Sequence, residues 1–182
     1  IRYEDGTEEL FVTDESWSGA DAPVVFAEIY DGEIYDGAKE IKGWSEAGCT
    51  AGQWKPVRKL DYDFSVLTGQ GSGKVSLMDE VKPKEIFETP EGDLVIDFGQ
   101  NMSALIQVTA TGKKGDVIRL DCFEVLDSKG NVYLDNLRGA KESLQYTFGE
   151  DGTITYRPSF TFMGFRYAKI VSFPGTPEPG NF

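Results

Sequence analysis

The seven residues Val117–Phe123, which read VIRLDCF, decide the fold class of this chain. Their side chains alternate, so that Ile118, Leu120 and Cys122 fall on one face and the charged residues between them fall on the other. A period of two is the repeat of a β-strand with one buried and one solvated face. The stretch therefore predicts a half-buried strand with Cys122 as a buried free thiol, although the sequence leaves a disulfide to Cys49 open.

Segments on both sides of this stretch continue the same pattern. The residues that share a face are, in turn, Leu144, Tyr146 and Phe148, then Ile154 and Tyr156, then Phe165, Tyr167 and Val171. Apolar runs at 94–98 and 104–110 add two strands, and glycines separate many of these runs, as expected of turns. One short helix is expected over Asp135–Leu144, with Asp135 or Asn136 as its N-cap. We therefore expect an all-β chain folded as an antiparallel β-sandwich, of the jelly-roll kind.

The composition excludes several classes of function. The net charge of −13 repels phosphate backbones and anionic lipids, so neither nucleic acid nor a membrane is expected as a partner. The chain has no histidine, which excludes Ser-His-Asp and Cys-His nucleophile systems and most zinc sites. Neutral sugars, cations and basic protein surfaces remain open as partners.

The chain reads as two parts of unequal regularity. Residues 61–83 carry no clear hydrophobic period, so we place a boundary ahead of them. Residues 1–60 then form part of one β module, and residues 61–182 form a larger one. Because the chain starts at Ile1 without an initiator methionine, we expect a fragment, and the lack of a visible signal peptide says little about localisation.

Several segments, taken together and in order, resemble the bacterial α-L-rhamnosidases of the glycoside hydrolase family seventy-eight type. In the second half they are Ile96–Asn101 (IDFGQN), Phe123–Asp127 (FEVLD), Gly130–Tyr133 (GNVY), Asn136–Arg138 (NLR) and Pro158–Tyr167 (PSFTFMGFRY). In the first half they are Tyr3–Thr7, Thr13–Trp17 and Tyr30–Asp36. Two positions depart from the family pattern: Met163 stands where histidine is usual, and Leu144 stands where aspartate is usual.

The resemblance implies a multi-domain bacterial enzyme whose location, cytoplasmic or exported, stays open. Residues 1–60 would be the C-terminal part of the family's N-terminal β module, and residues 61–182 its concanavalin-like β-sandwich. In the family, two carboxylates of a helical (α/α)6 domain hydrolyse the glycoside with inversion. Nothing in this chain resembles that domain, so no catalytic residue is carried over. The catalytic domain of the same parent chain is instead the expected partner.

The stretch from Tyr30 to Trp44 carries the candidate substrate-binding residues. Its candidates are Tyr30, Asp31, Glu33, Tyr35, Asp36 and Trp44. Carboxylates are ligands that calcium prefers, and aromatic rings offer flat faces to sugar C–H groups. Some modules of the resembled family bind rhamnose through calcium, so a rhamnose-containing glycan and a calcium ion are candidate ligands. The alternative is that these acidic turns bond their own backbone.

Five residues of the second half are expected to be structural. Asp97, Gly99 and Asn101 read as a turn in which the glycine takes a special backbone angle and the polar side chains satisfy loose amides. Glu124 and Arg166 lie beside large apolar residues, where charged groups are rarely left alone. We predict that Arg166 pairs with Glu124 or with Asp97 and fixes the strand register.

Aromatic residues near the C-terminus are expected to lie in the core. They are Phe160, Phe162, Phe165 and Tyr167.

Three function classes compete for this chain: an accessory β-sandwich of a rhamnosidase, an autonomous carbohydrate-binding module, and a small glycosidase on a β scaffold. A glycosidase needs two carboxylates that face each other across a cleft. The family resemblance favours the first class, with the binding module as the alternative.

Overall fold

The structure is a computed structural model that describes residues 1–69, 71–73 and 75–182. The regular elements of the described residues are strands, which the period-two pattern predicts, and short 3-10 helices, which it does not. The expected helix over Asp135–Leu144 is wrong, because only η3 (Asp135–Leu137) is helical and strand β11 begins at Ser143. Within the described residues, no helix is both long and apolar enough to span a bilayer.

The chain divides into two compact units, and each draws on two segments of sequence. The first unit comprises residues 1–21 and 41–77, and the second comprises residues 22–40 and 78–182. In the first unit β1 (Ser18–Gly19) pairs with β4 (Lys55–Pro56), and η2 covers Phe64–Val66. None of its described residues is buried. The boundary at residue 60 between modules of a parent protein stays a prediction.

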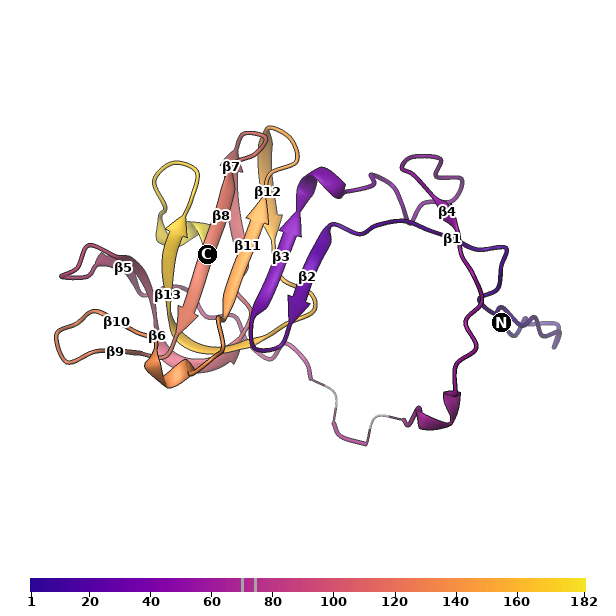
Figure 1. Cartoon of the computed structure of the whole chain (residues 1–182), viewed down its shortest axis with the longest axis horizontal. Helices are drawn as coiled ribbons and strands as arrows, with labels where there is room; N and C mark the ends of the chain where they lie inside the picture. The colour runs from indigo at the N-terminus through magenta and orange to yellow at the C-terminus, as the bar shows by residue number, and fades with distance from the viewer. Residues whose placement is uncertain (70, 74) are drawn as a thin grey trace. The chain divides into compact units, whose positions relative to one another are not determined.

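The second unit is built on a seven-stranded sheet, shown in Figure 1. In spatial order its strands are β2 (Val24–Glu28), β3 (Gly32–Asp36), β11 (Ser143–Thr147), β8 (Val117–Phe123), β13 (Met163–Ser172), β6 (Leu94–Ala104) and β5 (Glu85–Glu88). All neighbours are antiparallel except β3 and β11, which are parallel. The hairpin of β2 and β3 therefore joins the sheet formed by strands far along the chain.

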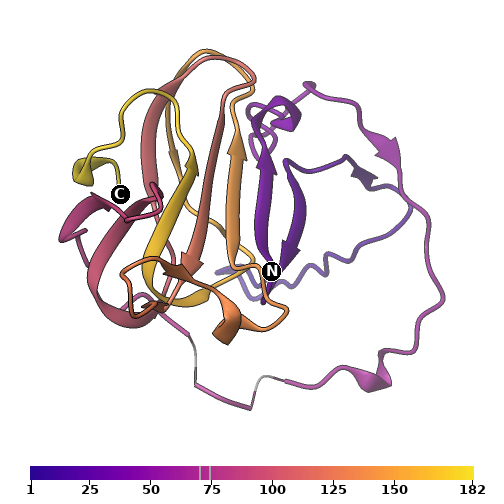
Figure 2. The same ribbon diagram turned by 60° about the vertical axis from the view of Figure 1, so that its left-hand side comes forward.

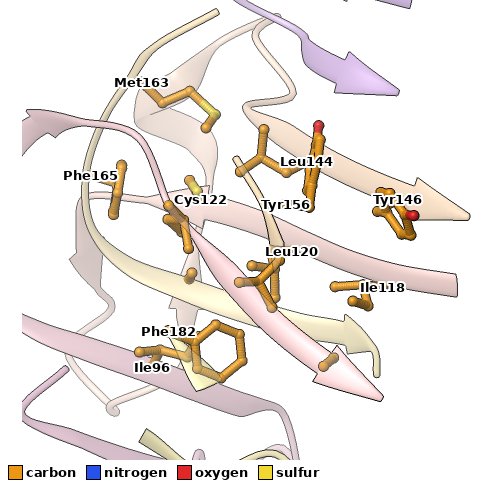
Figure 3. Packing of buried hydrophobic residues seen from close by; sticks show 14 of the residues in the cluster. Ile96, Ile118, Leu120, Cys122, Leu144, Tyr146, Tyr156, Met163, Phe165 and Phe182 are labelled. Carbon is orange, nitrogen blue, oxygen red and sulfur yellow. The ribbon is translucent and has the colours of Figure 1, made fainter. Parts of the chain in front are cut away.

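Smaller elements complete this unit. The remaining elements are β7 (Val108–Gly112), β9 (Val125–Leu126), β10 (Val132–Tyr133), β12 (Gly152–Tyr156), η1 (Gly37–Lys39) and η4 (Pro179–Asn181). The antiparallel pair of β7 and β12 lies against one face of the large sheet (Figure 2). Its buried apolar side chains belong to the main core. Figure 3 shows the resulting core, in which Leu120 of β8, Leu144 of β11 and Tyr156 of β12 lie together. The expected antiparallel sandwich is thus confirmed, with one parallel pair as the exception.

The opposite face of the large sheet carries a second, smaller apolar cluster. Val95, Phe123 and Tyr167 are buried there, beside partly buried residues of the β9–β10 region. The expectation that Phe165, Tyr167 and Val171 share one face is wrong. Phe165 lies in the main core, Tyr167 lies in the second cluster, and Val171 is exposed.

The cause of this change of face is a register shift between β13 and β6. Phe165 pairs with Met102, whereas Tyr167 pairs with Asp97. One residue of β13 therefore lies opposite four residues of β6, and this bulge turns the following side chains to the other face.

Two of the aromatic residues expected in the core are exposed. Phe160 is 70% exposed and Phe162 is 47% exposed, whereas Phe165 and Tyr167 are buried as expected. The first two precede β13, in an irregular segment whose side chains follow no strand period.

Candidate functional site

Asp97, one of the two partners predicted for Arg166, holds the bulge in β6 through its hydrogen bonds. The guanidinium of Arg166 donates two hydrogen bonds of 2.9 Å to the two carboxylate oxygens of Asp97. Asp97 also accepts the backbone N–H of Gly99 at 2.6 Å, and Gly99 has a φ of +82°. Arg166 thus pairs with Asp97 rather than with Glu124, and the glycine takes the left-handed backbone angle that the bulge needs.

Electrostatics favour the charged form of this pair. The hydrogen bond from Arg166 lowers the pKa of Asp97 below its ordinary value, and this effect outweighs the burial of the carboxyl. The guanidinium also lies over the ring of Tyr167, with 4.8 Å between the Cζ atom and the ring centroid. The pair therefore joins the bulge to the second apolar cluster.

The carboxylate of Glu124 accepts hydrogen bonds from side chains of two other motifs. Its Oε1 accepts the Asn101 amide at 3.2 Å, and its Oε2 accepts the Asn136 amide at 2.6 Å. Asn101 belongs to the bulge of β6, and Asn136 belongs to η3. Two segments that resemble family motifs are thus tied to one carboxylate, which supports the structural interpretation of Glu124 and Asn101.

Glu142 is a group in this region that sequence reasoning missed. Its Oε2 is buried without a hydrogen-bond partner among the described residues. Burial, and then the charge of Glu124, raise the pKa of Glu142 to about 7. Its φ of 45° is also unusual for a residue other than glycine. No period or motif marks this residue, because its backbone partners Tyr30 and Cys122 are distant in sequence.

Glu33 is buried rather than available to a ligand. The residue is 1% exposed, and its carboxylate accepts the Tyr156 hydroxyl and the backbone N–H groups of Ser159 and Phe160, each at 2.9 Å. Burial first, and then the charge of Glu33, raise the pKa of Tyr156. A buried carboxylate needs several donors of this kind, so Glu33 fixes the loop that precedes β13.

The other acidic candidates also have partners within the protein. Asp31 forms an ion pair with Lys141 at 2.9 Å, and Asp36 accepts the backbone N–H of Ala38 at the start of η1. Among the described residues, no group of three or more His, Cys, Asp or Glu side chains is arranged to hold a metal ion. The acidic residues of this stretch are thus bonded within the protein, and the calcium site stays a prediction.

The aromatic candidates are spread over both units. Trp44 belongs to the first unit and is 68% exposed, whereas Tyr30 and Tyr35 belong to the second. Tyr30 is exposed at the turn between β2 and β3. Tyr35 is partly buried, and its hydroxyl donates to Glu40 at 2.5 Å.

Tyr35 also lines a pocket of about 350 Å³ in the second unit. The other lining residues are Glu40, Tyr146, Ile154, Thr155, Tyr156, Arg157 and Ser159. The rings of Tyr35 and Tyr146 stack with their centroids 5.3 Å apart. The pocket thus combines aromatic side chains with groups of both charges.

Comparison with known proteins places this geometry in a family. The model of the bacterial α-L-rhamnosidase concanavalin-like domain matches residues 87–182, and the model of the α-L-rhamnosidase N-terminal domain matches residues 1–79. An α-L-rhamnosidase of Streptomyces avermitilis is 37% identical over 98% of this chain. The chain belongs to the bacterial α-L-rhamnosidase family.

Solved structures of α-L-rhamnosidases share the fold. The enzyme of Streptomyces avermitilis complexed with L-rhamnose superposes with a TM-score of 0.90, 36% identity and 99% coverage of this chain. The native enzyme of Aspergillus terreus superposes with a TM-score of 0.89, 33% identity and 98% coverage. The family resemblance drawn from the motifs is therefore confirmed.

The chain spans only a minor part of these rhamnosidases. It covers 17% of the curated Streptomyces avermitilis relative, 20% of one from an Alteromonas strain, and 21% of the Aspergillus terreus chain. The chain therefore corresponds to the N-terminal and concanavalin-like domains of a much larger rhamnosidase polypeptide.

Proposed function

We propose that this chain is a non-catalytic portion of an α-L-rhamnosidase, and that it packs against and positions the catalytic domain of the same polypeptide. The observation that carries the proposal is the match to the N-terminal and concanavalin-like domains together with the small share of the relatives' length. The carboxylates of the candidate site fit this role, because Asp97, Glu124 and Glu33 are all occupied by hydrogen bonds within the protein.

The whole enzyme, in this proposal, hydrolyses terminal α-L-rhamnosides with inversion. An acid and a base carboxylate of a helical domain outside this chain would flank the scissile bond, with room for a water. The direct test is the hydrolysis of a chromogenic rhamnoside by this chain alone and by the full-length enzyme. We expect turnover by the full-length enzyme only. Turnover by this chain at a comparable rate would refute the proposal.

A second candidate function is carbohydrate binding at the pocket of Tyr35. The observation that favours it is the convergence of Tyr35, Tyr146 and Tyr156 with Glu40 and Arg157 around one opening. In this proposal the partly exposed ring of Tyr35 contacts sugar C–H groups, and Glu40 and Arg157 bond hydroxyls.

Titration calorimetry with rhamnose, with and without calcium, tests this second candidate. Binding heat that Arg157→Ala abolishes would support the pocket. No heat at millimolar rhamnose in either condition would exclude rhamnose as its ligand.

A further inference from the structure

A loop that belongs to a family motif displays two phenylalanines to solvent. Phe160 and Phe162 lie between the buried Pro158 and strand β13, and both are exposed. A single exposed apolar residue is ordinary, but adjoining large ones on a soluble domain mark an interaction surface.

The loop is fixed by a buried carboxylate. Glu33 accepts the backbone N–H groups of Ser159 and Phe160, so the backbone that carries Phe160 is held from within the domain. The Thr161 hydroxyl donates to the backbone oxygen of Glu28 at 3.1 Å, which ties the loop to the end of β2. The backbone that carries the exposed rings is thus held in place before any partner binds.

The hydrogen bond between Thr161 and Glu28 ties this loop to a turn that carries a second pair of apolar residues. Ile29 and Tyr30 follow Glu28 in the turn between β2 and β3, and they are 47% and 66% exposed. The backbone oxygen of Tyr30 accepts the N–H of Glu142, so this turn is also anchored. We define the apolar patch as Ile29, Tyr30, Phe160 and Phe162.

We propose that the apolar patch is the surface on which the catalytic part of the rhamnosidase polypeptide docks. This inference rests on the proposed function and names the contact through which positioning occurs. The relatives carry about four-fifths of their length outside the region matched by this chain, so a large surface of the same polypeptide is available to cover the patch. Rigid aromatic anchors of this kind contribute most of the binding energy at interface centres.

A cation at the rim defines the partner's chemistry further. Arg157 is exposed at the start of the loop, and its side chain forms no hydrogen bond or ion pair with any described residue. The docking surface is therefore apolar at its centre, with a carboxylate opposite Arg157.

Hydrogen–deuterium exchange tests this contact in the isolated chain and in the full-length enzyme. We expect amides of the turn at 29–31 and of residues 161–162 to exchange roughly tenfold more slowly in the full-length enzyme. Equal exchange in both would overturn the proposal. Slow exchange of these amides already in the monomeric isolated chain would overturn the proposal, because the first unit would then be what covers the apolar patch. Protection that appears with dimerisation of the isolated chain would overturn it in favour of a second copy.

Substitutions separate docking from folding and from catalysis. Phe160→Glu with Phe162→Glu should leave the thermal midpoint of the isolated chain unchanged and should expose the full-length enzyme to roughly tenfold faster proteolysis between its parts. The control Tyr133→Glu replaces an exposed aromatic residue on β10 and should change neither. Unchanged proteolysis in an active full-length enzyme refutes the docking surface alone, whereas turnover by the isolated chain refutes the proposed function itself.

Discussion

Arg166 on β13 donates two parallel hydrogen bonds to Asp97 on β6 at the point where the register of the two strands shifts. A bulge of this kind leaves backbone groups without ladder partners and bends the strand. The bidentate pair offsets that loss, because Asp97 also accepts the N–H of Gly99 inside the bulge. The pair therefore sets which face of the sheet Phe165 and Tyr167 occupy.

Asp97→Asn should destabilise the second unit. Asparagine retains one acceptor for Gly99 but removes the charge that faces Arg166, so we expect a loss of about 2 kcal/mol in urea unfolding at neutral pH. Because Arg166 lowers the pKa of Asp97, the stabilisation is present above the unfolded value of 3.8 and disappears as the pH falls below it.

The control for this prediction is Asp121→Asn. Asp121 pairs with the more exposed Arg119, so its loss should be at most about 1 kcal/mol. Equal losses for the two variants would show that the bulge does not depend on the Asp97 carboxylate.

Glu33→Gln should loosen the loop before β13. The amide has the same shape, but its NH₂ group faces donors from Ser159, Phe160 or Tyr156, which leaves at least one buried donor without an acceptor. We expect a loss of about 2 kcal/mol and faster amide exchange at Ser159 and Phe160. Glu88→Gln, at an exposed position on β5, should leave both quantities unchanged. Wild-type exchange in the Glu33 variant would contradict its anchoring role.

The two cysteines should differ in reactivity. Both are free thiols, as the strand pattern predicts for Cys122, and Cys122 is completely buried whereas Cys49 is partly exposed. Burial raises the pKa of the Cys122 thiol, which removes the reactive thiolate. A thiol reagent should therefore label one cysteine rapidly in the native chain and two in denaturant. Rapid labelling of native Cys49→Ser would contradict the burial of Cys122.

The strands and the core could be predicted from the sequence, because each half-buried strand carries its own period. The side on which Tyr167 lies could not, since the extra residues belong to β6 and leave no trace in the sequence of β13. The Arg166–Asp97 pair was predictable as one of two choices from charges beside apolar residues. The burial of Glu33 was not predictable, because its donors lie more than a hundred residues away along the chain.

Glu142 should make the stability of the second unit depend on pH near neutrality. Burial and the charge of Glu124 raise the pKa of Glu142 from 4.5 in the unfolded chain to about 7. A carboxyl whose pKa is higher in the folded state favours folding fully below pH 4.5, and this contribution is lost as the pH rises through about 7. Glu142→Gln, which cannot ionise, should therefore match the wild type at pH 4.5 and exceed it at pH 8. The gain should be about 1 kcal/mol, because the group is only partly shielded from water.

Urea unfolding across this range measures the difference, with Glu91→Gln at an exposed turn as the control. A constant difference between variant and wild type from pH 4.5 to 8 would show that Glu142 is not the titrating group.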